Sequence, residues 1–467
     1  MRWKAILATL GFMVAFTITF SVAAANPYMV IVRESNLVDK KVIAFYYPWY
    51  SNATNYTRSA PYPVVDDTAW RHWNGSTLNT PLMGAYDSAD PATIEQHLRD
   101  AEWAGIDALV WSYWGASGYE FTNFKNALGV ARAINSNVSF TVYFEIFMND
   151  MESKSISEAS TFISNELAAI HAVFTDPANE PLIWHELGKP VLFVYVVQAV
   201  PAAVWANVMA NVSASGANFF MVADRPGGSI DYNKHFQATH QYDVYYPSYH
   251  GTYFETYMRM KMDAARFGQL FIAGVSPGYD DHLVRPGNPP LPRNGNATYR
   301  QSWCNAISLH PDWIAITSWN EWHEGTEIEP SVENGRAALE QTRAYAAEFK
   351  SGTYQQLQAV DFYTPMIANA IWMAVVSWVV FAAACFLPAL ARKSEHYGLR
   401  FAFGLLLVVM AWVGVFAFGA WEIVLGNNLA IMGAWYVFIA PVLCGFHAIG
   451  TWLLQSRPDG PRQRERR

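Results

Sequence analysis

The sequence predicts an α/β protein: a (β/α)8 barrel of the TIM type, followed by a helical transmembrane region of three spans. The barrel is predicted from residues 26–352, where short apolar runs alternate with segments of helical periodicity through eight units. The membrane region is predicted from three long apolar segments within residues 366–455. The alternative for residues 26–352 is an open doubly wound sheet. No Gly-x-Gly-x-x-Gly motif follows the first strand, so a dinucleotide-binding site has no support.

The predicted strands are nearly continuous apolar runs rich in Val, Ile, Phe and Tyr, as buried parallel strands are. They are Val42–Tyr47, Ile106–Ser112, Ser139–Phe147, Pro190–Val197, Asn218–Ala223, Asp243–Tyr249, Leu270–Val275 and Trp313–Ser318. The predicted helices between them have apolar residues at helical spacing. They are Ala92–Ala104, Phe121–Ile134, Ile156–Phe174, Ala202–Ala214, Ile230–Thr239, Tyr253–Phe267, Thr298–Leu309 and Ala337–Phe349, of which Ile230–Thr239 has the weakest pattern.

Residues 353–365 are predicted to link the barrel to the membrane region. The predicted spans are Met366–Ala391, Phe401–Trp421 and Leu429–Leu454, which carry no charged residue. Each span is long enough to cross a hydrocarbon core of ~30 Å. Lys and Arg gather in the first connecting loop and in the tail, residues 456–467, but are absent from the second loop. The positive-inside rule therefore places the tail in the cytoplasm and the barrel on the extracytoplasmic side of a multi-pass membrane protein.

Residues 1–25 have a basic start, an apolar run and small residues at the end. Both a cleaved signal peptide and an uncleaved signal anchor fit this pattern, and both lead to export. Export is compatible with N-glycosylation of a glycoprotein, because all Asn-x-Ser/Thr sequons fall within residues 26–365. These sequons begin at Asn52, Asn55, Asn74, Asn137, Asn211 and Asn296.

Composition excludes two classes of protein and disfavours one class of partner. The chain is 52% hydrophobic and 15% charged and has three Cys, which excludes a disordered chain and a small disulfide scaffold. Residues 26–365 contain 21 Lys and Arg against 35 Asp and Glu, a net charge of −14. We therefore expect no nucleic-acid partner. The lipid bilayer is an expected partner, and the sequence identifies no protein partner.

Aromatic and acidic residues gather just after the predicted strands, where the active sites of such barrels lie. A cleft lined by flat rings and carboxylates suits a sugar, because rings stack on sugar C–H groups and carboxylates bind hydroxyls. A role in the core is the alternative for each aromatic residue. The candidate substrate-binding residues are Tyr47, His72, Trp73, Trp114, Glu145, Tyr249, Tyr279, Asp280, Asn320 and His323.

Two glutamates, Glu321 and Glu324, follow the last predicted strand and are the candidate catalytic residues. Two acids three residues apart can project into one cleft, and cleavage of a glycosidic bond needs such a pair. We interpret Glu327 and Glu329 as structural. A divalent metal site formed with His323 is the alternative, but the spacing matches no strong metal motif.

The run Trp319–Glu329 resembles the signature of glycoside hydrolase family 99, the endo-α-mannosidases and endo-α-mannanases. Other runs resemble that family in the same order: His72–Asn74, Gly84–Gly115, and Gly274–Asp281 followed by Arg285-Pro286. The resemblance spans residues 41–350. The fourth strand of this sequence ends Val194-Tyr195-Val196-Val197-Gln198, where relatives usually carry Asp after the Tyr.

The resemblance implies a retaining endo-acting enzyme on mannose-containing glycans or polysaccharides, without metal or organic cofactor. Glu321 would deprotonate the sugar 2-hydroxyl, which attacks the anomeric carbon and gives an anhydro-sugar intermediate. Glu324 would act as the acid and then as the base for water. The resemblance also implies that Glu145 is an acidic site residue and that Tyr47, Trp114 and Tyr279 line the sugar pocket. A non-catalytic glycan-binding membrane protein on the same barrel is the alternative function, and a channel or transporter has little support.

Overall fold

The computed structural model describes residues 38–51, 73, 77–285 and 287–353, which all lie in one compact unit. The predictions for residues 1–25, for the linker beyond residue 353, for the three spans and for the tail lie outside the described residues. Among the described helices, none combines the length and the apolar character that crossing a membrane requires.

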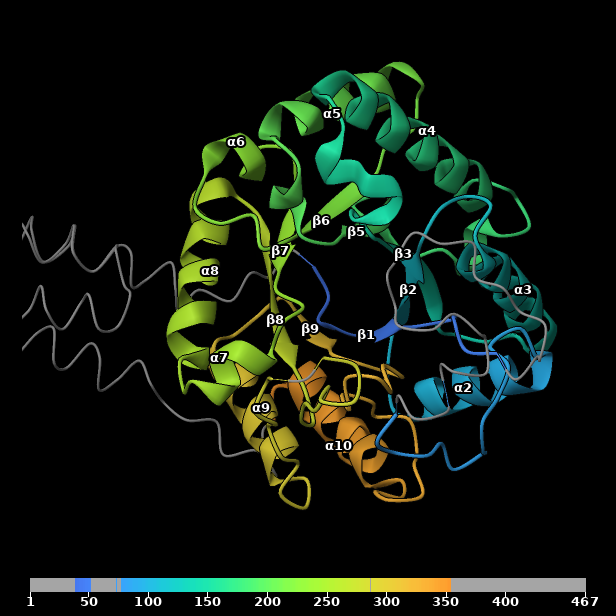
Figure 1. The fold of residues 1–467 in the computed structure, drawn as a ribbon, viewed down its shortest axis with the longest axis vertical. Coiled ribbons are helices and arrows are strands. Elements are labelled where there is room, and N and C mark those ends of the chain that lie inside the picture. Colours follow the sequence, from blue (N-terminus) through green and yellow to red (C-terminus); the bar gives the residue numbers. More distant parts are fainter. Residues whose placement is uncertain (1–37, 52–72, 74–76, 286, 354–467) are drawn as a thin grey trace, which may run out of the picture. The chain divides into compact units, whose positions relative to one another are not determined.

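Eight parallel strands close into a barrel, which confirms the predicted fold (Figure 1). Each strand pairs with the next in the series, and the last strand pairs with the first. The strands are β1 (Lys41–Tyr46), β2 (Ala108–Tyr113), β3 (Ser139–Phe144), β5 (Lys189–Val194), β6 (Phe220–Asp224), β7 (Ala238–His240), β8 (Leu270–Val275) and β9 (Trp313–Ile316).

Helices surround the strands in Figure 1. The α-helices are α2 (Pro91–Trp103), α3 (Tyr119–Ile134), α4 (Ile156–Phe174), α5 (Ala202–Ala214), α6 (Ile230–Asn233), α7 (Tyr245–Tyr249), α8 (Tyr253–Phe267), α9 (Ala297–Ser308) and α10 (Ala337–Ser351). The short 3-10 helices are η2 (Met148–Ser153), η3 (Glu180–Leu182) and η4 (Val197–Ala199). Local sequence explains several starts: Asp90 caps α2 ahead of Pro91, and Ser155 with Glu158 forms a capping box on α4.

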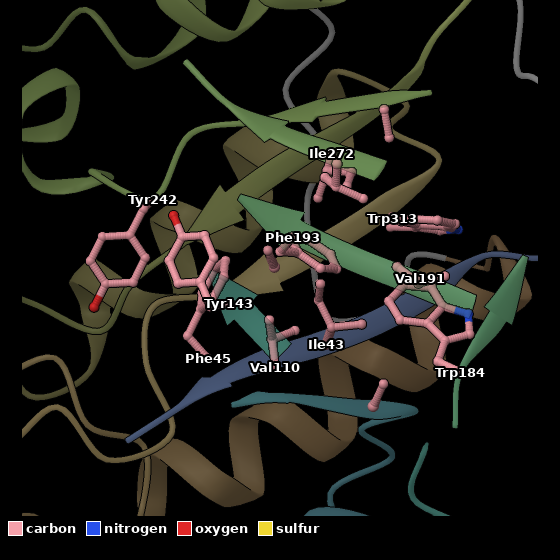
Figure 2. Close-up of a cluster of buried hydrophobic side chains, with 14 of the residues drawn as sticks. Ile43, Phe45, Val110, Tyr143, Trp184, Val191, Phe193, Tyr242, Ile272 and Trp313 are labelled. Atoms are coloured by element: carbon pink, nitrogen blue, oxygen red, sulfur yellow. The ribbon is translucent and has the colours of Figure 1, made fainter. Parts of the chain in front are cut away.

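The interior of the barrel is filled by side chains in layers, as Figure 2 shows. Trp184 and Trp313 pack at one end, with ring centroids 4.5 Å apart. Phe45, Tyr143 and Tyr242 lie at the other end, toward which the strands run. The layer at this second end contains tyrosines, so polar hydroxyls form the floor of the region where the βα loops meet.

The predicted sixth strand, Asp243–Tyr249, is wrong, because residues 245–249 form helix α7. An Asp243 side-chain oxygen accepts the N–H of Tyr246 at the start of α7, and Pro247 has no N–H to give to a strand ladder. The strand at this place is β7, a three-residue Ala-Thr-His segment that the weakest helical prediction, Ile230–Thr239, partly covered. β7 contains no large apolar residue, so the sequence pattern did not indicate a strand there.

A short strand, β4 (His185–Glu186), also escaped prediction and pairs antiparallel with β5. Leu187 and Gly188 connect the two strands, and both have positive φ, at 50° and 75°. This is the backbone conformation of a two-residue hairpin turn, in which glycine carries no steric penalty.

Candidate active site

The predicted catalytic residues lie on one tight turn after β9. The N–H of Glu324 donates to the carbonyl oxygen of Glu321 at 3.2 Å, and Ser318 Oγ accepts the N–H of Glu321 at 2.7 Å. Glu321 is 4% exposed, and the side chain of Glu324 is 15% exposed. The turn therefore places both carboxyl groups in a largely dry environment on the same side of the barrel.

The segment that carries this turn is folded back on itself and packed tightly. Ser318 and Thr326 bond through both their backbone and their side chains, at 2.9 and 2.8 Å. Gly325, directly after Glu324, has a φ of +61°, and a Cβ there would lie 3.2 Å from the carbonyl oxygen of Asp280. A glycine is required at this position, both for its φ and for the close approach of the two loops.

Asn320 connects the turn to the end of β1. Its Oδ1 accepts the N–H of Tyr47 at 2.7 Å, and its Nδ2 donates to the carbonyl oxygen of Tyr47 at 3.0 Å. Nδ2 also donates to the hydroxyl of Tyr86 at 3.1 Å. Asn320 is fully buried, so these bonds give it a positioning role, and its direct contact with a substrate stays a prediction.

A buried polar network supports the turn from behind. Tyr86 donates to Glu329 Oε2 at 2.8 Å, and Trp322 Nε1 lies 3.2 Å from the same oxygen. His97 joins Glu329 to the hydroxyl of Tyr46, at 3.1 and 2.9 Å. Glu329 is therefore a structural acid, as the sequence predicted. Glu327 is structural as well, because it is buried and paired with Arg293 at 2.6 Å.

A third buried acid, Glu145, lies just after β3. Ser112 Oγ donates to Glu145 Oε1 at 2.9 Å, and Trp114 Nε1 donates to Ser112 Oγ at 2.8 Å. The pKa of Glu145 is raised to about 8, chiefly by burial; the Ser112 bond opposes the rise, and the negative charges of Glu321 and nearby acids add to it. Glu145 therefore holds a proton at neutral pH.

Glu324 has a pKa raised to about 7, first by burial and then by the charge of Glu321. Arg285 opposes this rise, because its Nη2 lies 2.6 Å from Glu324 Oε1. The charge of Glu324 therefore changes near neutral pH. Glu321 has a different neighbour: His323 Nδ1 lies 3.2 Å from its Oε1.

Tyr47 lies among the three acids. Burial raises its pKa well above the ordinary value, and the charges of Glu321, Glu145 and Glu324 raise it further. The pKa of Tyr242 is raised by burial and by charges that include Glu324 and Glu321. The three glutamates thus converge on one tyrosine-lined floor at the end of the barrel.

An aromatic cluster lies on the Glu321 side of this floor. The ring of Tyr50 stacks on Trp73, with centroids 4.3 Å apart, and on His323, at 5.4 Å. Tyr50 also donates to the carbonyl oxygen of Asn320 at 3.0 Å. Tyr50 thus contacts both Trp73 and His323, and His323 lies beside Glu321, while His72 lies outside the described residues.

Two of the remaining predicted residues, Tyr279 and Asp280, lie near Glu324. The hydroxyl of Tyr279 donates to Asp281, an acid 3.4 Å from Arg285. The backbone N–H of Asp280 donates to the carbonyl oxygen of Glu324 at 2.7 Å, and its side chain pairs with His282. Tyr249 is on α7, is 43% exposed and contacts Tyr245 and His250.

Sequence reasoning missed Tyr242 as a candidate site residue, and it named Arg285 only as part of a motif. Tyr242 follows β7, the strand that escaped prediction, so the rule that site residues follow strands would have found it once β7 was placed. Arg285 has no such signal, because it lies ten residues beyond the end of β8. Among the described residues, no group of three or more His, Cys, Asp or Glu side chains is arranged to hold a metal ion.

Comparisons with known proteins show the family of this chain. The sequence model described as glycosyl hydrolase family 99 matches residues 37–359. The glycoprotein endo-alpha-1,2-mannosidase of Rattus norvegicus is 26% identical over 328 residues, which are 62% of this chain and 68% of the rat protein. The protein of that name from Xenopus laevis is 25% identical, over 63% of this chain and 71% of its own length.

A solved structure shows the same fold. It is the GH99 endo-alpha-mannosidase of Bacteroides thetaiotaomicron, which superposes with a TM-score of 0.56 at 22% identity. The match covers 68% of this chain and 99% of the bacterial chain. The family match extends over the whole barrel, from before β1 to beyond α10, so this chain belongs to glycosyl hydrolase family 99 and is a glycoside hydrolase.

Proposed function

We propose that this protein is a retaining endo-acting α-mannosidase that cleaves internal α-mannosidic linkages of a glycan. The observation that carries the proposal is the convergence of Glu321, Glu324 and Glu145 around Tyr47. The names of the related rat and frog proteins support an α-1,2-mannoside as the substrate. The family membership supports hydrolysis as the reaction.

The first chemical step uses the two glutamates in different roles. Glu321 accepts the proton of the sugar 2-hydroxyl as that oxygen bonds to the anomeric carbon. The bond to the leaving oxygen breaks at the same time, and Glu324 gives its proton to that oxygen. The pKa of Glu324 near 7 suits this donor, because the carboxyl group is protonated in a large fraction of molecules at neutral pH.

The second step reverses the proton transfers. Glu324, now ionised, takes a proton from water, and the hydroxide bonds to the anomeric carbon. The bond between that carbon and the 2-oxygen breaks, and the 2-oxygen recovers its proton from Glu321. Two inversions give net retention. Such participation needs a 2-hydroxyl trans to the leaving group, which an α-mannoside provides.

The other predicted residues have a supporting role in this proposal. Glu145 is protonated at neutral pH and can donate a hydrogen bond to a sugar oxygen. The Trp114–Ser112–Glu145 chain fixes the orientation of that carboxyl group. Tyr47, Tyr279, Trp73 and His323 provide rings and hydrogen-bonding groups at the wall of the site.

A substrate series tests the proposal. We expect hydrolysis of oligosaccharides with internal α-1,2-mannosidic bonds and retention of the anomeric configuration, measured by NMR of the first product. The matched 2-deoxy substrate should fail, because it lacks the internal nucleophile. Cleavage of that substrate at the ordinary rate would contradict participation of the 2-hydroxyl. Binding of the mannosides without any cleavage would favour the glycan-binding alternative.

We also propose that the enzyme is a multi-pass membrane protein with its barrel on the extracytoplasmic side. The support is the three uncharged apolar segments in residues 366–455 and the basic residues of the first loop and the tail. The sequon residues Asn137 and Asn211 are exposed and accessible to a glycosylating enzyme. Protease added to intact cells should digest the barrel and spare an epitope on the tail, and the reverse pattern would overturn this orientation.

A further inference from the structure

A row of aromatic side chains leads from the candidate active site onto the surface of α7. The ring of Tyr279 stacks on Tyr245, with centroids 4.2 Å apart and an interplanar angle of 23°. Tyr245 contacts Tyr249 at 5.6 Å, and Tyr249 contacts His250 at 5.2 Å. His250 contacts Tyr246 at 4.3 Å, which completes the row. Each ring in the row touches the next.

The inner end of the row is fixed to the catalytic pair through charged groups. Tyr279 donates to Asp281 at 2.7 Å, Asp281 lies 3.4 Å from Arg285, and Arg285 pairs with Glu324. The charge of Glu324 is also the first cause after burial that raises the pKa of Tyr279. The row therefore starts beside Glu324, whereas the aromatic cluster around Tyr50 lies beside Glu321.

The outer end of the row is open to solvent. Tyr249 is 43% exposed and Tyr246 is 59% exposed. Within the described residues, the exposed large aromatic side chains are these two and Trp103, which packs under Arg336 and Arg343. Tyr245 is half-buried and held by a bond from its hydroxyl to the carbonyl oxygen of Pro289, at 2.7 Å. The outer rings of the row are therefore exposed at the protein surface and are not part of the core.

The position of the row relative to Glu324 indicates which end of a substrate would contact the row. A general acid contacts the glycosidic oxygen, so the sugars beyond the acid belong to the leaving group. We propose that Tyr245, Tyr249 and Tyr246 form a binding platform for additional sugars of the leaving group, which would make the enzyme selective for long α-mannan chains. This inference rests on the proposed function, because it takes Glu324 as the acid.

The chemistry of the row suits a carbohydrate. Sugar rings present C–H groups that pack on aromatic faces, and tyrosine hydroxyls and the His250 ring offer hydrogen bonds at the edges. Asp243 lies at the start of α7, with a side chain 31% exposed, and adds a hydrogen-bond acceptor. The stacked contact with Tyr279 and the bond to Pro289 hold Tyr245 in place before a ligand arrives, which lowers the entropy cost of binding.

The test compares leaving groups of different length in the full-length chain in detergent. The substrates are α-mannosides whose leaving group is one mannose or four mannoses, and the variants are Tyr249→Ala and Tyr246→Ala, singly and together. We expect the double variant to lose roughly tenfold in kcat/KM on the long substrate, as a rise in KM with kcat unchanged. Activity on the short substrate should stay at the wild-type level.

The matched control is Trp103→Ala, which also removes an exposed aromatic ring. Trp103 ends α2, and a helix that returns alongside parallel strands ends at the opposite face of the barrel from the active site. This variant should leave both substrates unaffected. Equal losses on the short and long substrates in the double variant, or no loss on the long one, would overturn the platform.

A binding measurement separates failure of the platform from failure of the proposed function. Calorimetry with an α-mannan hexasaccharide needs no turnover, and the Glu321→Gln background prevents cleavage during titration. Weaker binding in the double variant, but not in Trp103→Ala, supports the platform even if the chain cleaves no mannoside. Cleavage of mannosides with unchanged hexasaccharide binding would retain the function and overturn the platform. Neither binding nor cleavage in the unsubstituted chain would overturn both.

Discussion

Arg285 Nη2 lies 2.6 Å from Glu324 Oε1, so the proposed general acid is paired with a cation. Burial and the charge of Glu321 raise the pKa of Glu324, while Arg285 lowers it. The balance of these opposed effects leaves the pKa at about 7, where a donor can give and regain a proton. Arg285 thus adjusts the acidity of Glu324 and also connects it to Asp281 and Tyr279.

The first prediction concerns this pair. The acid must be protonated for the first step, so the alkaline limb of kcat/KM against pH should lie near the pKa of Glu324 in the free enzyme. Arg285→Met removes the cation that lowers this pKa and should move the limb to higher pH. Arg336→Met breaks a comparable pair with Asp100, at 2.6 Å, and should leave the limb in place. An unmoved limb in Arg285→Met would mean that another group limits the alkaline side.

The second prediction separates the roles of the two glutamates. Glu324→Gln should lose about 10²–10⁴-fold on natural substrates, whose leaving groups need protonation. An activated aryl leaving group should recover much of this loss, because it departs without a proton. Glu321→Gln should not recover, since the 2-hydroxyl needs a base with every leaving group. Glu102→Gln, on the exposed end of α2, is the control. Equal recovery of both variants would remove the distinction between acid and base.

The third prediction is that part of the stability of the barrel falls as pH rises. The pKa of Glu145 is raised from 4.5 to about 8 in the folded state, so between these values the folded state binds more protons than the unfolded one. The contribution is present below about pH 4.5 and is lost as pH rises toward 8. Its slope is at most about 1.4 kcal/mol per pH unit for one proton. The melting temperature followed by tryptophan fluorescence should therefore depend less on pH in Glu145→Gln. A Glu102→Gln variant should keep the wild-type slope, and an unchanged slope in Glu145→Gln would contradict the raised pKa.

The fourth prediction concerns the network behind the catalytic turn. Tyr86→Phe removes a hydroxyl that donates to Glu329 and accepts from Asn320. We expect a loss of about 1–3 kcal/mol in the free energy of unfolding, because buried partners are left unsatisfied. We also expect a lower kcat, because Asn320 positions the end of β1. Denaturant unfolding and steady-state kinetics measure the two effects.

The control for Tyr86→Phe is Tyr232→Phe, which breaks a single bond from α6 to the carbonyl oxygen of Val200. It should cost less stability and leave kcat unchanged. A Tyr86→Phe variant with lower stability and unchanged kcat would show that the network supports the fold without positioning the turn.

The sequence predicted the barrel because long apolar periodicities are strong signals. The bounds of β8, α4, α5 and α8 in the structure are those that the pattern indicates. The prediction failed at β7, where three small or polar residues form a strand because both neighbouring strands supply ladder partners. Tertiary pairing of this kind leaves no trace in local composition.

Part of the candidate site could be predicted because its residues follow strands with strong apolar patterns. Glu321, Glu324 and Glu145 lie at the ends of strands whose starts the pattern placed correctly, and the structure brings them together around Tyr47. The pattern extended both strands too far, because β3 ends at Phe144 and not Phe147, and β9 ends at Ile316 and not Ser318. The ion pair between Arg285 and Glu324 depends on the conformation of the long loop after β8. The apolar periodicity of the sequence does not predict the conformation of a loop. The use of each residue in binding or catalysis stays a prediction.

The bonds between Asn320 and Tyr47 join residues 273 positions apart in the chain. They close the first strand onto the loop after the last one, so the geometry of the catalytic turn depends on both ends of the barrel. A chain still emerging from the ribosome has no such partner for Tyr47 until the final strand has been synthesised. We therefore expect hydrolytic activity to arise only with completion of the barrel, so that a chain lacking the last strand and its loop is inactive.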